Sequence, residues 1–148
     1  MMKQMKLFTV ALMCMMMQTM VCNANHDVMI SVSQLPSAAK TFVQKQFPGK
    51  KILYAQQDGN FKAKFETRLD DGTEIEFDRI GNWEKIECKP SAVPAALVPA
   101  PILNQVNANF PGAAILKIDK ESYGFKVELA NDIELKFSKN GRLMGFDD

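Results

Sequence analysis

The side chains that most often carry out nucleophilic and acid–base chemistry are few in this chain. The only histidine, His26, lies near the N-terminus, and the three cysteines are Cys14, Cys22 and Cys88. A Ser/His/Asp or Cys/His apparatus needs its histidine on a rigid element, and chain termini are usually mobile. The sequence therefore predicts no nucleophilic active site.

Paired carboxylates are the next candidate chemistry. Glu74 with Glu76, or Glu66 with Glu128, could act as acid and base, as carboxylate pairs do in glycosidases. The same segments alternate these residues with Lys and Arg, which keeps carboxylates ionised and paired. We therefore predict a structural use for these pairs and a protein that is not an enzyme.

The sequence also contains few residues that could form a metal or phosphate site. Asp70-Asp71-Gly72 resembles half of a calcium loop, but the later ligands of an EF-hand are missing, so we interpret it as a turn. Asp147-Asp148 and His26-Asp27 offer only weak sites for a divalent ion. The sequence has no zinc-ligand spacing and no glycine-rich phosphate loop. We predict no cofactor.

The composition is that of an ordinary globular protein. Of the 148 residues, 47% are hydrophobic and 24% charged, and 18 Lys and Arg nearly balance 17 Asp and Glu. A net charge of +1 gives no electrostatic reason to expect nucleic acid or an anionic membrane as a partner.

Residues 1–24 are typical of a signal peptide. Lys3 and Lys6 give a basic start, residues 7–17 are almost wholly apolar, and Cys22-Asn23-Ala24 places small residues at a signal-peptidase site. We predict cleavage after Ala24 and export to the periplasm or secretion. No membrane insertion is expected of the mature chain, because no later stretch approaches the roughly 20 apolar residues of a membrane span. Two alternatives stay open: a lipoprotein anchored through Cys22, although Met20-Val21 lacks the usual small residue before it, and an uncleaved anchor.

Cleavage would leave Cys88 as the only cysteine, so the mature chain could form no internal disulfide. We interpret Cys88 as a small apolar strand residue, with a reactive or intermolecular thiol as the alternative.

The chain contains an internal duplication. Two segments of about 50 residues match, and the matching motifs are Leu35-Pro36 with Val98-Pro99, Phe47-Pro48-Gly49 with Phe110-Pro111-Gly112, and Phe61-Lys62 with Phe125-Lys126. The last match requires a one-residue insertion near Ser122, and a shorter middle hairpin in the second segment, at Asn131-Asp132, then aligns residues 74–77 with residues 134–137. We predict a lead-in over 25–34, a first unit over 35–89, a proline-rich connector over 90–98 and a second unit over 99–148.

Each unit changes its hydrophobic period in the same order. Ala38, Phe42, Val43 and Phe47 have helical spacing, and the residues that follow alternate between apolar and polar. Turn residues such as Asp71-Gly72 separate the alternating runs. The predicted fold is α+β: two tandem units, each a helix followed by four antiparallel strands, form one curved sheet with both helices on one face.

The other face of that sheet would carry mixed charge. Such a face suits a protein surface or an extended peptide better than a small molecule, and the alternative is a solvated face that only fixes strand register. The candidate partner-binding residues are Trp83, Tyr54, Lys62, Lys64, Glu66, Glu74, Glu76, Lys126, Glu128, Glu134 and Lys136.

Trp83, the only tryptophan, is the strongest single candidate because aromatic residues flanked by charges often anchor protein interfaces. If Glu84, Ile86 and Cys88 share one face, Trp83 lies on the charged face near Tyr54. A twist or bulge would instead turn Trp83 inward or over a sheet end.

The chain resembles a known family over residues 33–148. The residues that carry the resemblance are Leu35-Pro36, Phe47-Pro48-Gly49, Asp71-Gly72, Phe77 and Gly81-Asn82-Trp83, with Val98-Pro99, Phe110-Pro111-Gly112, Phe137 and Gly141 in the second unit. The family is PepSY-like and is described as β-lactamase-inhibitor-like. The resemblance implies an exported protein, common in Bacteroides-type bacteria, with two tandem units in a curved sheet. The analogous inhibitor grips an enzyme with its concave face, and PepSY relatives occur in protease propeptides. Leu143 stands where the first unit has Trp83, so the two units are not expected to bind equally.

The sequence thus predicts a non-catalytic exported module that binds a protein or peptide, and an inhibitor of a periplasmic or secreted enzyme is the most specific form of this prediction. The alternatives are a small-ligand- or metal-responsive cell-envelope accessory protein and a structural envelope component.

Overall fold

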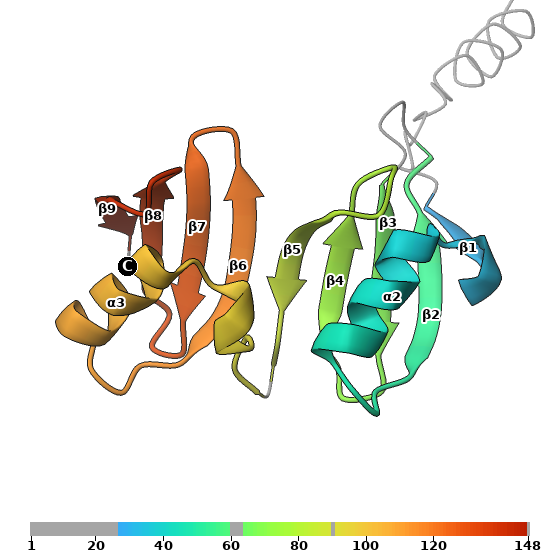
Figure 1. The fold of residues 1–148 in the computed structure, drawn as a ribbon, viewed down its shortest axis with the longest axis horizontal. Coiled ribbons are helices and arrows are strands. Elements are labelled where there is room, and N and C mark those ends of the chain that lie inside the picture. The colour runs from blue at the N-terminus through green and yellow to red at the C-terminus, as the bar shows by residue number, and fades with distance from the viewer. Residues whose placement is uncertain (1–26, 60–63, 90, 148) are drawn as a thin grey trace, which may run out of the picture.

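The described part of the chain forms one antiparallel sheet with two α-helices on one of its faces (Figure 1). The structure is a computed structural model that describes residues 27–59, 64–89 and 91–147. The predicted signal peptide with its cleavage site after Ala24, Cys22, His26 and the candidate Lys62 lie outside the described residues. Among the described residues, no helix is both long and apolar enough to span a membrane. The predicted α+β class is confirmed.

The strands lie in the sheet in the order in which they occur in the chain, and each is antiparallel to its neighbours. They are β1 (Val28–Ile30), β2 (Ile52–Gln57), β3 (Phe65–Leu69), β4 (Glu74–Phe77), β5 (Trp83–Glu87), β6 (Ile115–Glu121), β7 (Gly124–Leu129), β8 (Glu134–Ser138) and β9 (Leu143–Asp147). The helices are α2 (Ser37–Gln46) and α3 (Ala100–Asn109), and the short 3-10 helices are η1 (Val32–Gln34) and η2 (Ala95–Leu97).

Both helices start and stop at the predicted residues. Each begins directly after a proline, Pro36 or Pro99, whose fixed φ suits the start of a helix. Each ends at a phenylalanine: the N–H of Phe47 donates to the Val43 carbonyl, and that of Phe110 donates to the Val106 carbonyl. The Pro-Gly that follows cannot continue the helix.

The core lies between the helices and the sheet. Alternate residues of the strands point into it, and the largest fully buried side chains include Phe77 and Phe137. Cys88 also lies there, 1% exposed, and burial raises the pKa of its thiol, although Thr73 hydrogen-bonds to its sulfur. Cys88 lies directly after β5 and not in it, but its burial fits a small apolar core residue better than a reactive thiol.

The hairpin prediction was wrong. The β3–β4 and β7–β8 connections have equal length, residues 70–73 and 130–133. Phe65 pairs with Phe77 as Phe125 pairs with Phe137, so the counterpart of Phe125 is Phe65, not Phe61. The two halves differ in length in the β2–β3 connection instead. The prediction missed this because Phe61 and Phe65 have the same parity, so the sequence alone does not say which of them begins the ladder.

Strand β1 was not predicted, since residues 25–34 were expected to be only a lead-in. It pairs with β2 over just three residues, Ile30 opposite Ala55, Met29 opposite Gln56 and Val28 opposite Gln57. A segment this short carries too little alternation to mark it as a strand.

Candidate functional site

The face of the sheet opposite the helices carries charged side chains from β3 to β9, and we call it the open face. Alternation places these side chains on one side of every strand, and the strand registers align them into two rows that cross the sheet. The first row is Glu66, Glu76, Lys85, Asp119, Lys126 and Lys136. The second row is Arg68, Glu74, Glu87, Lys117, Glu128, Glu134 and Asp147.

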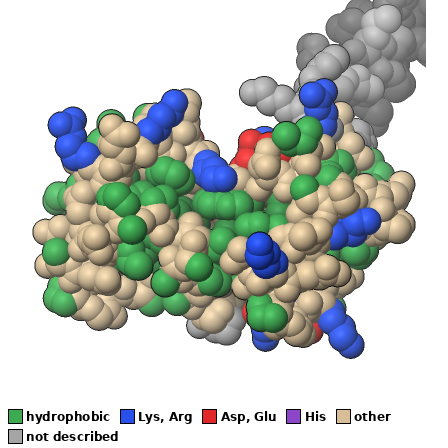
Figure 2. Space-filling model, viewed as in Figure 1, with side chains coloured by type: hydrophobic (Ala, Val, Ile, Leu, Met, Phe, Trp, Pro, Cys, Tyr) green, Lys and Arg blue, Asp and Glu red, His purple; other side chains and the backbone are tan. Residues whose placement is uncertain are grey.

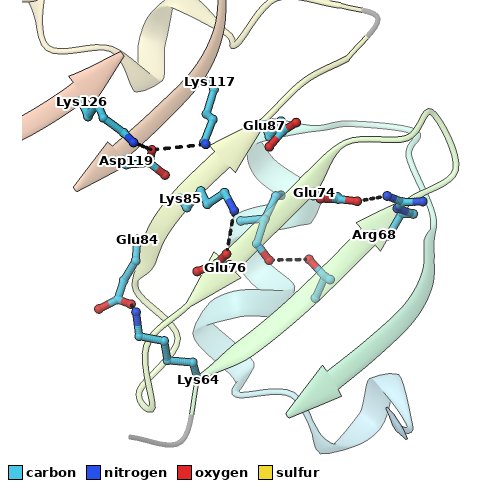
Figure 3. A network of polar contacts seen from close by, with 12 residues as sticks. Lys64, Arg68, Glu74, Glu76, Glu84, Lys85, Glu87, Lys117, Asp119 and Lys126 are labelled. Atoms are coloured by element: carbon cyan, nitrogen blue, oxygen red, sulfur yellow. Dashed lines mark hydrogen bonds and ion pairs between the residues drawn. The ribbon is translucent and has the colours of Figure 1, made fainter. Parts of the chain in front are cut away.

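Ion pairs connect neighbouring strands within and between these rows (Figure 3). Lys85 Nζ lies 2.9 Å from Glu76 Oε1, and Arg68 pairs with Glu74. At the margin of the face, Lys64 Nζ lies 2.6 Å from Glu84 Oε2, and the hydrogen bond to Glu84 raises the pKa of Lys64. The side chains are half-exposed, so each pair stabilises the fold only slightly.

Asp119 lies near the middle of the open face. Its Oδ2 is 3.7 Å from Lys117 Nζ and 3.9 Å from Lys126 Nζ. Burial raises the pKa of the Asp119 carboxyl, and the two lysines oppose that shift. Asp119 therefore connects the charges of β6 with those of β7.

Several directly opposed residues carry like charges. Glu66 faces Glu76, Lys126 faces Lys136, and Glu128 faces Glu134. Like charges in directly opposed positions destabilise a sheet, whereas a face that serves only to fix register would place opposite charges there. The charge pattern of the open face is therefore not the one that favours stability most.

Trp83 lies on the helix side, not on the open face. The β4–β5 register shifts between Glu76 and Phe77, so Trp83 pairs with the fully buried Phe77, while Lys85 stays on the open face opposite Glu76. The bulge changes the parity of the strand, which was the second of the two alternatives left open for this residue. Trp83 packs against the core, and Lys120 Nζ lies 3.8 Å from its ring centroid.

Tyr54, in contrast, lies where it was predicted. It pairs with Arg68, whose guanidinium carbon is 5.9 Å from the Tyr54 ring centroid. The structure thus places together on the open face or at its margin all the predicted binding residues that it describes except Trp83. Lys85, Glu87, Lys117, Asp119 and Asp147 also lie on this face but were not among the predicted binding residues, although alternation assigned Lys117 to the charged face and, with one choice of parity, Lys85 and Glu87 as well.

A shallow hollow of about 670 Å³ surrounds Trp83 on the helix side. Phe42 of α2, Leu97 of η2 and Lys120 of β6 contribute to its lining. Figure 2 shows apolar side chains gathered over the middle of this side, between the two helices. This hollow and the open face lie on opposite sides of the sheet, so a single small ligand cannot contact both.

The chain matches a known protein family over more than half of its length. Residues 62–145 match the family described as "Putative beta-lactamase-inhibitor-like, PepSY-like". The chain belongs to this PepSY-like family. The resemblance predicted from the sequence is confirmed.

Crystal structures of three Bacteroides proteins are similar to this PepSY-like protein. One, from Bacteroides thetaiotaomicron, is described as a "putative calcium-regulated periplasmic protein"; it is 36% identical with a TM-score of 0.78, and the match covers 82% of this chain and 97% of that one. Two are from Bacteroides vulgatus. A "putative periplasmic protein of unknown function" is 30% identical with a TM-score of 0.79, covering 82% and 99% of the two chains. A "putative periplasmic protein" of the DUF2874 family is 35% identical with a TM-score of 0.79, covering 84% and 99%.

No curated protein matches this PepSY-like chain. The three similar Bacteroides proteins are described as periplasmic, and their descriptions name no reaction.

Proposed function

We propose that this PepSY-like protein is a non-catalytic, exported module that binds a protein or an extended peptide on its open face. The observation that carries the proposal is the set of like-charged pairs across neighbouring strands, such as Lys126 with Lys136. Direct opposition of like charges is unfavourable in itself, and ion pairs offset it here, Lys126 with Glu134 at 3.7 Å and Lys136 with Asp147 at 2.7 Å. Residues whose arrangement conflicts with stability are often retained for function. The periplasmic descriptions of the relatives and the predicted signal peptide support export.

We further infer that the molecule consists of two tandem units, α2 with β2–β5 and α3 with β6–β9. The supporting observation is that the register shifts recur at matching places: between Glu76 and Phe77 opposite β5, and between Lys136 and Phe137 opposite β9. The proline-rich segment 90–98 would connect the units.

The two units present opposite charges at matching positions. Glu66 corresponds to Lys126, and Glu76 to Lys136, because both pairs hold the same places in the β3–β4 and β7–β8 ladders. One partner that spans both units fits this asymmetry better than two copies of one ligand. Such a partner would place basic groups near the first unit's glutamates and acidic groups near Lys126 and Lys136. Inhibition of a periplasmic or secreted enzyme is the most specific form of this function.

The test compares two charge reversals of equal size. The predicted mature chain is used as bait in an extract of its own cell envelope, and each captured protein is purified and its affinity measured. We expect Lys126→Glu/Lys136→Glu to lose the partner, and the control Lys45→Glu/Lys139→Glu, at exposed positions of α2 and of the β8–β9 turn, to keep it. Equal binding by both double variants, or turnover of a substrate by the protein, would contradict the proposal. A purified partner enzyme that keeps its activity in the complex would contradict the inhibitor form alone.

The second candidate is a metal-responsive envelope protein. Two observations favour it: one relative is described as calcium-regulated, and a hollow of about 190 Å³ in the first unit is lined in part by Asp27, Asp58, Glu66 and Glu76. Within the described ranges, no group of three or more His, Cys, Asp or Glu side chains is arranged to hold a metal ion. Thermal unfolding in calcium, with magnesium as the control, tests this candidate: selective stabilisation by calcium supports it, and an unchanged transition contradicts it.

A further inference from the structure

Strand β9 forms one edge of the sheet. Its inner edge pairs with β8, and no described strand pairs with its outer edge. Two large apolar side chains of β9 are exposed, Phe146 by 65% and Met144 by 57%. An edge strand with exposed apolar residues is a template for pairing with another chain.

Strand β5 corresponds to β9 but has a neighbouring strand, β6, on its outer edge. Ile75 pairs with Ile86 in β4–β5 as Leu135 pairs with Phe146 in β8–β9, so Phe146 holds in β9 the place that Ile86 holds in β5. Strand β6 covers the outer edge of β5, with Ile118 opposite Ile86, and both isoleucines are fully buried. Phe146 is exposed because nothing in the described chain takes the place of β6.

The edge of β2 is covered in the same way. Ile30 of β1 lies opposite Ala55, which corresponds to Ile118 in the matching ladder of the second half. Each first strand, β2 or β6, thus has a strand beside it. Among the described strands, only the outer edge of β9 lacks the neighbour that its counterpart has.

The backbone of β9 is also oriented for pairing. The N–H of Cys88 donates to the carbonyl of Leu116 at 2.7 Å, in register with Ile86 and Ile118. Alternate residues of an antiparallel strand direct both backbone groups to the same side, so Ile86 directs its N–H and C=O toward β6. By correspondence, Phe146 directs its N–H and C=O outward, away from β8.

We propose that the outer edge of β9 binds an extended segment of a partner protein as an added antiparallel strand. The segment would copy β6, with an apolar residue opposite Phe146 and a basic residue opposite Asp147, as Lys117 lies opposite Glu87. Main-chain hydrogen bonds would supply affinity, and these two side-chain positions specificity.

A second copy of this chain fits the edge less well. If the β9 strands of two copies paired with Phe146 opposite Phe146, Asp147 would lie opposite Gly145 instead of a basic residue. The β2 edge of a second copy is not open to β9 either, because β1 already pairs with it. The proposal uses the backbone edge and not the open face, so it does not depend on the proposed function.

The probe is a synthetic peptide with the sequence of residues 113–121, which contains β6, added to the isotope-labelled chain from Asn25 onward. Nuclear magnetic resonance follows the β9 amides. We expect exchange of the Phe146 amide with solvent to slow by at least about tenfold at saturation. We expect Phe146→Pro to weaken peptide binding by at least about tenfold, since proline removes the outward donor without removing a hydrogen bond to β8.

The control leaves the protein unchanged. A peptide carrying Ile118→Pro lacks the donor that would face Phe146 and should bind at least about tenfold more weakly, even if Phe146→Pro fails to fold. Equal binding of the two peptides, or β9 amides that do not respond to the peptide, would overturn the proposal. Concentration-dependent protection of the Phe146 amide without peptide would assign the edge to a second copy and overturn it also.

Discussion

The Asp78 carboxylate holds the turn between β4 and β5. Its Oδ1 accepts hydrogen bonds from the N–H groups of Ile80 and Asn82, at 3.0 and 2.9 Å, and Oδ2 accepts one from Asn82 Nδ2 at 3.0 Å. Burial opposes ionisation, but these hydrogen bonds outweigh it and lower the pKa of Asp78. The matching turn uses Ser138, whose Oγ accepts the N–H of Arg142 at 3.1 Å.

A carboxyl whose pKa is lowered by folding stabilises the fold above its unfolded pKa, and that contribution is lost as pH falls through the folded pKa. We expect Asp78→Asn to lower the free energy of unfolding by about 1 kcal/mol at pH 7 and to flatten its pH dependence below about pH 4. Urea unfolding at several pH values measures both. Asp78→Ser, which copies Ser138, should lose less stability at pH 7, and an Asp78→Asn variant with unchanged pH dependence would contradict this account.

The ammonium of Lys120 over the Trp83 ring is a second contact that a single substitution can test. A cation at an exposed site stabilises an aromatic ring by about 0.5–1 kcal/mol. We expect Lys120→Met to lower the free energy of unfolding by that amount and to change the fluorescence emission of Trp83, the only tryptophan in the sequence. Lys139→Met, in the β8–β9 turn, is the control. Identical emission from wild type and Lys120→Met would show that the ammonium does not rest on the ring in solution.

At the scale of elements, Gly81 allows the start of α2 to rest on the β4–β5 turn. Gly81 has φ +95°, and a Cβ there would lie 2.8 Å from the Ala39 nitrogen and 2.9 Å from the Ala38 Cβ. Gly49, after α2, also has positive φ, at +78°, but a Cβ there would meet nothing within 4 Å. Substitutions at these two glycines therefore distinguish the cost of backbone strain, which both share, from the cost of a close contact, which only Gly81 has.

We expect Gly49→Ala to cost about 1 kcal/mol, the strain of a left-handed residue with a side chain. Gly81→Ala should cost about 2–4 kcal/mol, because α2 must also shift away from the turn. Thermal and urea unfolding of the two variants measure the difference. Equal losses would mean that the helix accommodates the methyl group without cost.

The sequence was enough to predict the helices, because proline and Phe-Pro-Gly mark their ends, and most strands, because alternation marks one buried face. It was not enough to place Trp83, since one extra residue in a strand reverses the parity of every position beyond it. The pairing of Phe65 with Phe77 was missed for a similar reason: Phe61 is an equally apolar candidate two residues away.

The open face was predictable residue by residue but not as an arrangement. Alternation selected Glu66, Glu128 and most of their neighbours, while Asp119 was overlooked. That Lys126 faces Lys136 became visible only with the β7–β8 register, which depends on where the turn over residues 130–133 begins and ends. Which charged residues oppose each other across two strands therefore depends on the strand register and not on the composition of the strands.

At the scale of the molecule, the buried side chains form one core that extends from Val43 of α2 to Val106 of α3. Ile86 and Ile118, each fully buried, join its two parts across β5 and β6. A continuous core favours cooperative unfolding.

We therefore expect one unfolding transition in urea, with the same midpoint by Trp83 fluorescence and by circular dichroism. Ile118→Ala should lower the free energy of unfolding by about 2–5 kcal/mol, as for other buried isoleucines. A fluorescence midpoint clearly below that of circular dichroism in the wild type would show that the first half unfolds independently.

The order of the strands in the sheet has a consequence for how the chain assembles. Because each described strand pairs only with strands next to it in sequence, no pairing waits for a distant segment, and the longest connections that must close, residues 31–51 and 88–114, contain the helices α2 and α3. Assembly can proceed vectorially, from the N-terminus to the C-terminus, with each new hairpin added to a finished edge. A chain that folds in this order needs no long-lived open intermediate, and an interruption at any strand leaves a shorter sheet of the same kind.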